Sequence, residues 1–379
     1  MIAASIIAII LVLCVMLWYL FVLVTRAASL SSKYHRSKKT SLILATATLL
    51  GITLAVFIAW MLNSLPLFLV FLVYVLLAAV VMEIVWLLAR LAYRRREAEP
   101  PRWASLIFRM SVIPLVVGLA VTSYGVYNMT HIHRVDYTVT SPKLEHEYTV
   151  LFVSDTHYGT VQDPDVLTQT ISEMKALEPD MVLLGGDIVD EGTDLGDISR
   201  VFNAFASIEP DMGVYYVWGN HDRSEYRHPP KTTESDVVAA MQEAGIIILR
   251  DESVQLSSDF TLIGRDDYGH FDAGNHASIN DLMDGVDTSS FLVTLEHQPR
   301  NANGNARAGV DLQLSGHTHA GQVWPFGAVV ALANNYTYGR YTIDDFTVIV
   351  SSGFAGWGLP VRTEGHCEYV VVHLHPSQP

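Results

Sequence analysis

Four long apolar stretches in the first third of the chain restrict its fold more than any other feature. They run over residues 2–24, 41–62, 65–89 and 105–124. An α-helix needs about 20 apolar residues to cross the hydrocarbon core of a bilayer. We therefore expect residues 1–127 to be a membrane domain with four transmembrane helices. The first stretch has no basic residues ahead of it and three more stretches follow, which is not typical of a cleaved signal peptide.

Charge divides the chain at the same place. Residues 1–127 contain 11 Lys and Arg against 3 Asp and Glu, whereas residues 128–379 contain 13 against 36. A basic, apolar part therefore precedes an acidic part. Because nucleic-acid binding depends on Lys and Arg that neutralise phosphates, we expect no nucleic-acid partner for the acidic part.

The loops between the apolar stretches predict their orientation. Residues 25–40 contain five basic residues and no acid, residues 90–104 contain five arginines, and the short loop between them near residue 63 is uncharged. The positive-inside rule places the two basic loops in the cytoplasm. Both termini would then lie outside the cytoplasm, in a multi-pass protein of the cell membrane. Two charges fall within the stretches, Glu83 and Arg109, and they either pair with each other or reach the interface separately.

From residue 145 onward, short apolar runs alternate with helical spacing, which predicts an α/β domain over residues 145–379. We expect residues 128–144 to be a linker between the two parts. After residue 246 the elements are mostly strands, so the sheet should be mixed or joined by a second sheet. The first three buried strands are expected at residues 148–154, 181–185 and 214–218.

Metal-binding residue types follow these apolar runs. In open α/β sheets, sites lie beyond the carboxyl ends of the strands, so we expect the side chains to meet there. They are two carboxylates, four imidazoles and one amide: Asp155, His157, Asp187, Asn220, His297, His317 and His319. Seven ligands are too many for one tetrahedral ion but suit two ions that share a bridging carboxylate. Two divalent ions a few ångströms apart activate water and clamp a phosphate.

The whole set resembles one known family. D-x-H, G-D, G-N-H-D, a lone His and G-H-T-H, in this order, resemble the calcineurin-like metallophosphoesterases. Their membrane-anchored bacterial members are more similar still, because there a small residue, Gly-Gln and an apolar stretch follow G-H-T-H, as AGQVWPFG does here. The resemblance covers residues 147–375 and implies a sandwich of two mixed β-sheets flanked by helices.

The resemblance also implies a role for each site residue. It implies that Asp155, His157 and His319 bind one metal, that Asn220, His297 and His317 bind the second, and that Asp187 bridges them. His221 would be the catalytic proton donor that protonates the leaving-group oxygen. Asp190 would be its orienting partner. These oxygen and imidazole ligands are compatible with Mn, Fe, Zn, Co or Ni, and we expect Mn.

One departure concerns phosphate binding. Protein phosphatases of this superfamily carry Arg-Gly after the second aspartate of the GDxxD motif, whereas Glu191 and Gly192 follow Asp190 here. This argues against a Ser/Thr phosphatase and leaves phosphate to the metals, with Arg223 as a further contact. We expect hydrolysis of a phosphate mono- or diester outside the cytoplasm, with membrane lipids as partners and a lipid as one candidate substrate.

Two alternatives remain open. The domain could face the cytoplasm and act as a pyrophosphatase on a nucleotide-linked lipid precursor, although the loop charges oppose this orientation. Alternatively, the chain could be a non-catalytic metal-binding membrane sensor, which predicts a missing ligand or acid. Trp324, Phe326 and Trp357 either line a pocket for a lipid chain or belong to the core, and we expect the core.

Overall fold

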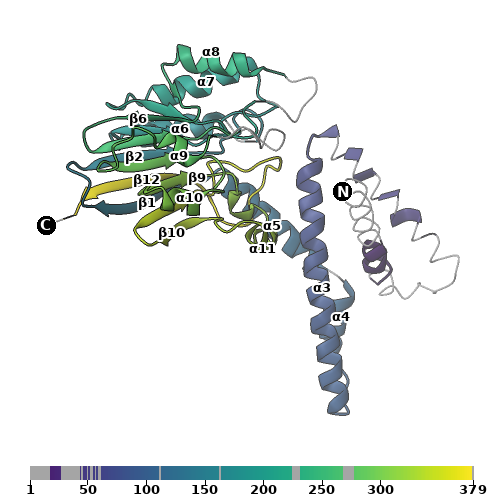
Figure 1. The fold of residues 1–379 in the computed structure, drawn as a ribbon. Coiled ribbons are helices and arrows are strands. Elements are labelled where there is room, and N and C mark those ends of the chain that lie inside the picture. Colours follow the sequence, from purple (N-terminus) through teal and green to yellow (C-terminus); the bar gives the residue numbers. More distant parts are fainter. Residues whose placement is uncertain are drawn as a thin grey trace. The chain divides into compact units, whose positions relative to one another are not determined.

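The computed structural model describes residues 18–26, 61–110, 112–161, 164–223, 231–267 and 277–377, with isolated positions between 43 and 58. The chain divides into two compact units, Met1–Tyr124 and Gly125–Pro379. Figure 1 shows the chain coloured along its sequence.

The first unit is helical. The long helix α3 (Leu65–Arg95) starts with a proline in its first turn and ends with two arginines, both of which favour these helix ends. It is followed by α4 (Arg102–Met110) and α5 (Val112–Met129), whose last turn belongs to the second unit. Among the described residues, α3 and α5 are the helices whose length and composition would allow them to cross a membrane.

The four predicted spans are therefore matched in part. The third lies within α3, and the region of the fourth is divided between α4 and α5. The first two lie for the most part outside the described residues. Glu83 on α3 pairs with Arg26, with Nη2 and Oε1 2.5 Å apart, and accepts a hydrogen bond from Tyr19. Glu83 thus forms an ion pair with a residue of segment 18–26, a partner that the sequence did not predict.

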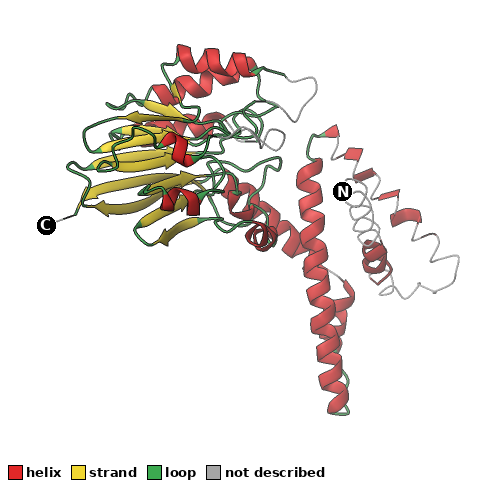
Figure 2. Ribbon diagram, viewed as in Figure 1, coloured by secondary structure: helices red, strands yellow, loops and turns green. Residues whose placement is uncertain are grey.

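The second unit contains two six-stranded sheets (Figure 2). The first has the order β1-β12-β2-β3-β4-β5 and is parallel except where β12 meets β2. Its strands are β1 (Ile132–Ser141), β2 (Tyr148–Val153), β3 (Met181–Leu184), β4 (Val214–Tyr216), β5 (Ile247–Ile248) and β12 (Cys367–Pro376). Much of the predicted linker, residues 128–144, thus forms the edge strand β1.

The second sheet has the order β10-β11-β9-β8-β7-β6, with antiparallel pairs at its two edges and parallel pairs between. Its strands are β6 (Glu252–Gln255), β7 (Phe260–Gly264), β8 (Phe291–Leu295), β9 (Leu312–Ser315), β10 (Gly339–Ile343) and β11 (Phe346–Val350). The helices of this unit are α6 (Pro164–Lys175), α7 (Leu195–Ala206), α8 (Glu234–Glu243), α9 (Ile279–Leu282), α10 (Ala302–Arg307), the 3-10 turn η1 (His319–Gly321) and α11 (Phe326–Ala333).

Alternate residues of one strand serve two cores. On β2, Val150 and Phe152 belong to the cluster between the sheets, whereas Leu151 and Val153 face the cluster that α6, α7 and α8 cover. A third cluster lies between the second sheet, α9 and α10. Because both faces are buried, the central strands are continuous apolar runs in the sequence. The expected α/β sandwich of two mixed sheets flanked by helices is confirmed.

Candidate metal centre

The seven predicted metal ligands lie in loops just beyond the ends of strands from both sheets. Asp155 and His157 follow β2, Asp187 follows β3, and Asn220 follows β4 in the first sheet. His297 follows β8, and His317 and His319 follow β9 in the second. The sheets therefore contribute side chains to one location, as the positions of the motifs predicted.

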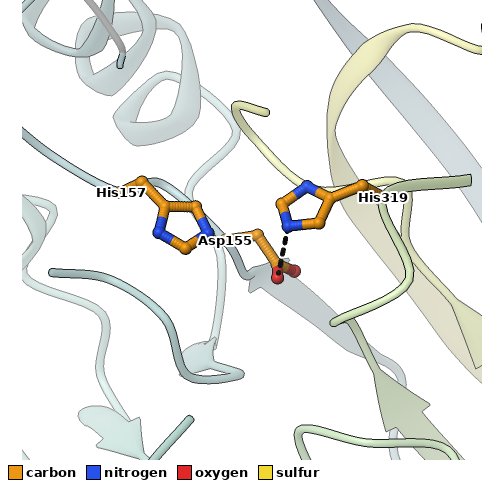
Figure 3. A group of neighbouring side chains, drawn as sticks. All are labelled: Asp155, His157 and His319. Atoms are coloured by element: carbon orange, nitrogen blue, oxygen red, sulfur yellow. Dashed lines mark ion pairs between the residues drawn. The ribbon is translucent and has the colours of Figure 1, made fainter. Parts of the chain in front are cut away.

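One group of potential ligands contains Asp155, His157 and His319 (Figure 3). One ligand atom from each lies within 4.8 Å of the others. His319 Nε2 is 3.5 Å from Asp155 Oδ1, and the rings of the two histidines stack with their centroids 5.4 Å apart. These three residues could hold one divalent cation.

A second group contains Asp187, His297 and His317, again with ligand atoms within 4.8 Å of one another. Asp187 Oδ2 lies 3.2 Å from His297 Nε2 and 3.9 Å from His157 Nε2 of the first group. One carboxylate oxygen therefore faces a histidine of each group, which is the placement a bridging ligand needs.

Asn220 is buried close to this centre, although it belongs to neither group. The residue is 8% exposed, and its Oδ1 has no hydrogen-bond partner among the described residues. The Nε2 atoms of His157 and His297 are likewise buried and have no hydrogen-bond partner among the described residues. Buried polar atoms normally have a partner. The unmatched oxygen and nitrogens are of the kinds that divalent transition metals bind, so the residues fit a pair of such ions.

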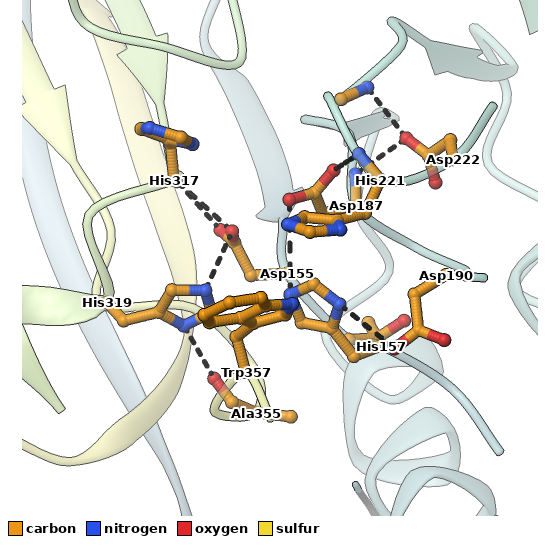
Figure 4. Close-up of polar contacts among 12 residues, drawn as sticks. Asp155, His157, Asp187, Asp190, His221, Asp222, His317, His319, Ala355 and Trp357 are labelled. Atoms are coloured by element: carbon orange, nitrogen blue, oxygen red, sulfur yellow. Dashed lines mark hydrogen bonds and ion pairs between the residues drawn. The ribbon is translucent and has the colours of Figure 1, made fainter. Parts of the chain in front are cut away.

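Backbone carbonyls orient two of the histidines. His297 Nδ1 is 2.8 Å from the Gly185 carbonyl oxygen, and His319 Nδ1 is 3.2 Å from that of Ala355 (Figure 4). Because a carbonyl oxygen can only accept, Nδ1 must carry the hydrogen in each pair when the ring is neutral. The Nε2 lone pair is then left for a metal, the arrangement common among metal-binding histidines.

The backbone is strained at five of the predicted ligands. Their φ angles are positive, which is uncommon for residues other than glycine and is concentrated at functional sites. The values are 56° for Asp155, 42° for His157, 52° for Asp187, 73° for His317 and 50° for His319.

The glycines of two motifs are needed for space. A Cβ on Gly219 of GNHD would lie 2.2 Å from Asp187 Oδ1, and a Cβ on Gly316 of GHTH would lie 2.2 Å from Asp155 Oδ2. Each glycine thus lets one strand-end loop approach the carboxylate of another. Neither has a positive φ, so close approach rather than an unusual turn explains them.

Burial and charge set the protonation of the site. Burial lowers the pKa of His317 to about 4 and that of His319 to about 3, which keeps both rings neutral, the form that binds metals. Burial alone would raise the pKa of Asp187, but His297 beside it outweighs burial and holds that pKa below its usual range.

Asp222 supports the centre without facing it as a ligand. It accepts hydrogen bonds from the backbone N–H groups of Asp187 and Gly219, at 2.7 and 2.6 Å, and from that of Val189. Burial and the neighbouring charge of Asp187 raise the pKa of Asp222 to about 6.

His221 lies at the rim of the centre, with its ring 5.5 Å from that of His157. Its Nδ1 is 2.7 Å from Glu191 Oε1. Asp190, expected as the orienting partner, instead places Oδ2 3.5 Å from His157 Nδ1 and accepts hydrogen bonds from Thr160 and the Gly192 backbone. The orienting contact thus belongs to Glu191, because the chain after β3 turns so that consecutive carboxylates meet different histidines.

Arg223 does not match the phosphate contact we expected. Its guanidinium binds both carboxylate oxygens of Asp266, at 2.5 and 2.7 Å, and the Asp267 carbonyl, and it lies over the Trp218 ring. Arg223 therefore connects the loop after β4 to the loop after β7 through an ion pair and a hydrogen bond.

Sequence reasoning missed Arg362. It is fully buried and donates to the carbonyl oxygens of His319, Ser352 and Ala355. It thereby positions both the His319 turn and the carbonyl that orients the His319 ring. No spacing or motif in the sequence marks this arginine.

Comparison with known proteins agrees with this geometry. Residues 148–321 match the family model of the calcineurin-like phosphoesterases. This part of the chain belongs to that family. A metallophosphoesterase of Helicobacter pylori is 33% identical over 238 residues, which are 62% of this chain and 62% of that protein. A transmembrane protein with metallophosphoesterase domain from Danio rerio is 27% identical over 305 residues, covering 76% of this chain and 67% of that protein.

The chain thus spans about three fifths of the length of the Helicobacter relative. The calcineurin-like phosphoesterase match contains Asp155, Asp187 and Asn220 and ends just after His319, so both candidate ligand groups fall within it.

Proposed function

We propose that the chain is a membrane-anchored, metal-dependent phosphoesterase that hydrolyses a phosphate mono- or diester. The observation that carries the proposal is Asp187, whose Oδ2 faces a histidine of each ligand group at 3.2 and 3.9 Å. Two divalent ions bound here would activate water and neutralise the charge that develops on phosphorus oxygens. The chain's own contribution is a ligand frame fixed by backbone carbonyls and by Asp222.

His221 would supply the proton to the leaving oxygen. Burial lowers the pKa of His221, but the hydrogen bond that its ring donates to Glu191 and the charge of Asp187 outweigh burial and raise the pKa above its usual value. A raised pKa keeps the imidazole protonated, which an acid requires. Trp357 stands beside it, with ring centroids 5.2 Å apart.

The test uses the purified full chain in detergent, loaded with Mn²⁺. Hydrolysis of a phosphodiester and of the matching monoester is measured, with bound metal determined by elemental analysis. We expect turnover of at least one ester, and we expect Asp187→Asn to lose metal and turnover together. Asp344→Asn, in the exposed turn between β10 and β11, is the matched control and should behave as the parent does. A parent chain with two bound metals and no turnover on either ester would contradict the proposal.

We further propose that the catalytic domain faces away from the cytoplasm, as the basic loops at residues 25–40 and 90–104 favour. A reporter enzyme that folds only outside the cytoplasm, fused after Pro379, should be active. Activity of a cytoplasmic reporter alone would reverse the orientation and favour a cytoplasmic substrate.

A further inference from the structure

The helix α11 exposes an apolar surface beside the candidate centre. Phe326, Val329 and Leu332, spaced three residues apart, are 53%, 60% and 89% exposed, and none of the helix's side chains is buried. Trp324 and Trp357 are 54% and 51% exposed. We call these five residues the apolar platform. The expectation that Trp324, Phe326 and Trp357 belong to the core was wrong. Contiguous exposed apolar side chains of this size mark an interaction surface.

Gln322 joins the platform to the candidate centre. It follows the η1 turn that carries His319, and its Oε1 accepts a hydrogen bond from the Trp357 backbone N–H at 2.9 Å. Its Nε2 donates to the carbonyls of Leu359 and Val361. Trp357 is thereby placed beside His221, with their ring centroids 5.2 Å apart. Both side chains are labelled in Figure 4. One end of the platform therefore borders the residue proposed as the acid.

The segment 361–365 joins the platform to the end of α5. On one side, Glu364 accepts a hydrogen bond from the Gly327 backbone N–H in the first turn of α11, at 2.8 Å. On the other, the Arg362 N–H donates to the Gly125 carbonyl at 2.9 Å, and Asn128 donates to the Arg362 and Gly365 carbonyls. The platform is therefore fixed close to the last turn of a helix that is apolar and long enough to cross a bilayer.

Sequence and composition indicate what covers this surface. The chain has no charged residue between His319 and Arg340, so the part of the platform from Trp324 to Leu332 has no charge of its own for a partner to recognise. Tyr127, in the last turn of α5, is 59% exposed and adds an aromatic ring at the end of α5 that contacts segment 361–365. Trp and Tyr are enriched where proteins meet the membrane–water interface. Continuity with α5 favours a bilayer over a protein partner.

We propose that the apolar platform inserts into the surface of the bilayer that α5 crosses, and that the substrate is a lipid phosphoester taken from that surface beside Trp357. Apolar helix faces bury themselves in this way at the boundary of headgroups and acyl chains. The substrate part of the inference rests on the proposed phosphoesterase function, whereas the insertion does not.

The first experiment measures insertion directly, without catalysis. The full chain with Cys14→Ser is reconstituted into vesicles of phosphatidylethanolamine and phosphatidylglycerol and spin-labelled at Leu332→Cys. Cys367 is fully buried and should not react. The matched site is Ile247→Cys, exposed on β5 at the opposite edge of the first sheet from β1. We expect the label at 332 to be relaxed by oxygen and shielded from a water-soluble nickel chelate, and the label at 247 to be reached by nickel.

Nickel access at 332 equal to that at 247 would overturn the insertion. Shielding of the 332 label from both oxygen and nickel would also overturn it, because that pattern indicates packing against another copy of the chain.

The second experiment compares two substrates. Val329→Glu/Leu332→Glu should lower kcat/KM on a phosphoester presented in vesicles by at least about tenfold. The double variant loses the free energy that is gained when these two apolar side chains move from water into the bilayer. Turnover of a water-soluble phosphoester should stay at the parent value, and Ile247→Glu should change neither. Equal losses on both substrates, or no loss on either, would overturn the lipid assignment. Failure of the proposed function itself would look different: the parent chain would turn over neither substrate, while the spin label still reported insertion.

Discussion

Glu191 binds His221: their Oε1 and Nδ1 atoms are 2.7 Å apart, and both side chains are largely buried. An acid at position 191 stands where protein phosphatases of the superfamily carry the arginine that grips phosphate. In this chain Glu191 instead orients the His221 ring and stabilises its protonated form. Burial favours the neutral imidazole and would lower the pKa of His221, but the Glu191 carboxylate, together with the charge of Asp187, raises this pKa.

We predict that Glu191→Gln weakens acid catalysis selectively. The neutral amide no longer stabilises the imidazolium, so turnover of an alkyl phosphoester, a poor leaving group, should fall by about tenfold or more. Turnover of a p-nitrophenyl ester, whose leaving group needs no proton, should change much less. Glu191→Asp should recover part of the loss, and His221→Ala should show the same leaving-group dependence more strongly. Equal losses on the two esters would show that Glu191 is merely structural.

Asp190 should act through metal binding instead. Its Oδ2 lies 3.5 Å from His157 Nδ1, the position from which an outer carboxylate orients a metal-binding histidine. We predict that Asp190→Asn lowers Mn²⁺ affinity by about 10- to 100-fold, and that excess Mn²⁺ restores turnover. Glu191→Gln is the matched control and should bind Mn²⁺ as the parent does. If the two variants bound Mn²⁺ with the same affinity, the assignment of Asp190 to metal binding and of Glu191 to acid catalysis would be wrong.

Gly219 should tolerate no side chain. An added Cβ would lie 2.2 Å from Asp187 Oδ1 and 2.3 Å from its backbone nitrogen, and neither atom can move without displacing the proposed bridging carboxylate. We predict that Gly219→Ala lowers stability by about 1–3 kcal/mol and reduces bound metal, as measured by thermal unfolding and elemental analysis. Gly196→Ala is the control, because a Cβ there meets nothing within 4 Å. A Gly219→Ala chain with full metal content and an unchanged Tm would contradict this prediction.

The first buried strands and the position of the site could be predicted because both depend on local patterns. Apolar runs buried on both faces marked β2, β3 and β4, and polar residues directly after them marked the edge of the sheet. The expectation that Asp155, Asp187 and the other candidate ligands meet followed from that edge, whereas the role of each residue came from the family resemblance.

Contacts made between distant parts of the chain could not be predicted in the same way. Arg362 donates a hydrogen bond to the His319 carbonyl, which lies 43 residues earlier in the chain. Tertiary packing brings the two residues together, and the spacing of residues in the sequence does not reveal it. The choice between Asp190 and Glu191 depends on the path of the chain after β3, because neighbouring carboxylates on a turn can point to different partners. The exposure of Phe326 was misjudged since an apolar run has the same sequence in a core and on a membrane-facing surface.

Asp259 links the entry of β2 to the start of β7, and it provides a test of stability against pH. It accepts hydrogen bonds from Tyr148, Ser257 and the Glu145 backbone, each at 2.6 Å, and from the His146 N–H. Burial opposes its charge, but these donors outweigh burial and hold its pKa well below the usual range. A lowered folded-state pKa adds stability that is present above the unfolded pKa of about 3.9 and is lost as the pH falls toward the folded value.

We therefore predict that Asp259→Asn destabilises the full chain by about 1–3 kcal/mol at neutral pH. The difference from the parent should shrink as the pH is lowered below about 4, because protonation progressively removes the charge that the four donors stabilise. Denaturant unfolding at a series of pH values measures this, with Asp344→Asn as the exposed control. A penalty that stayed constant across the acid range would mean that packing, rather than the charge on Asp259, accounts for its contribution.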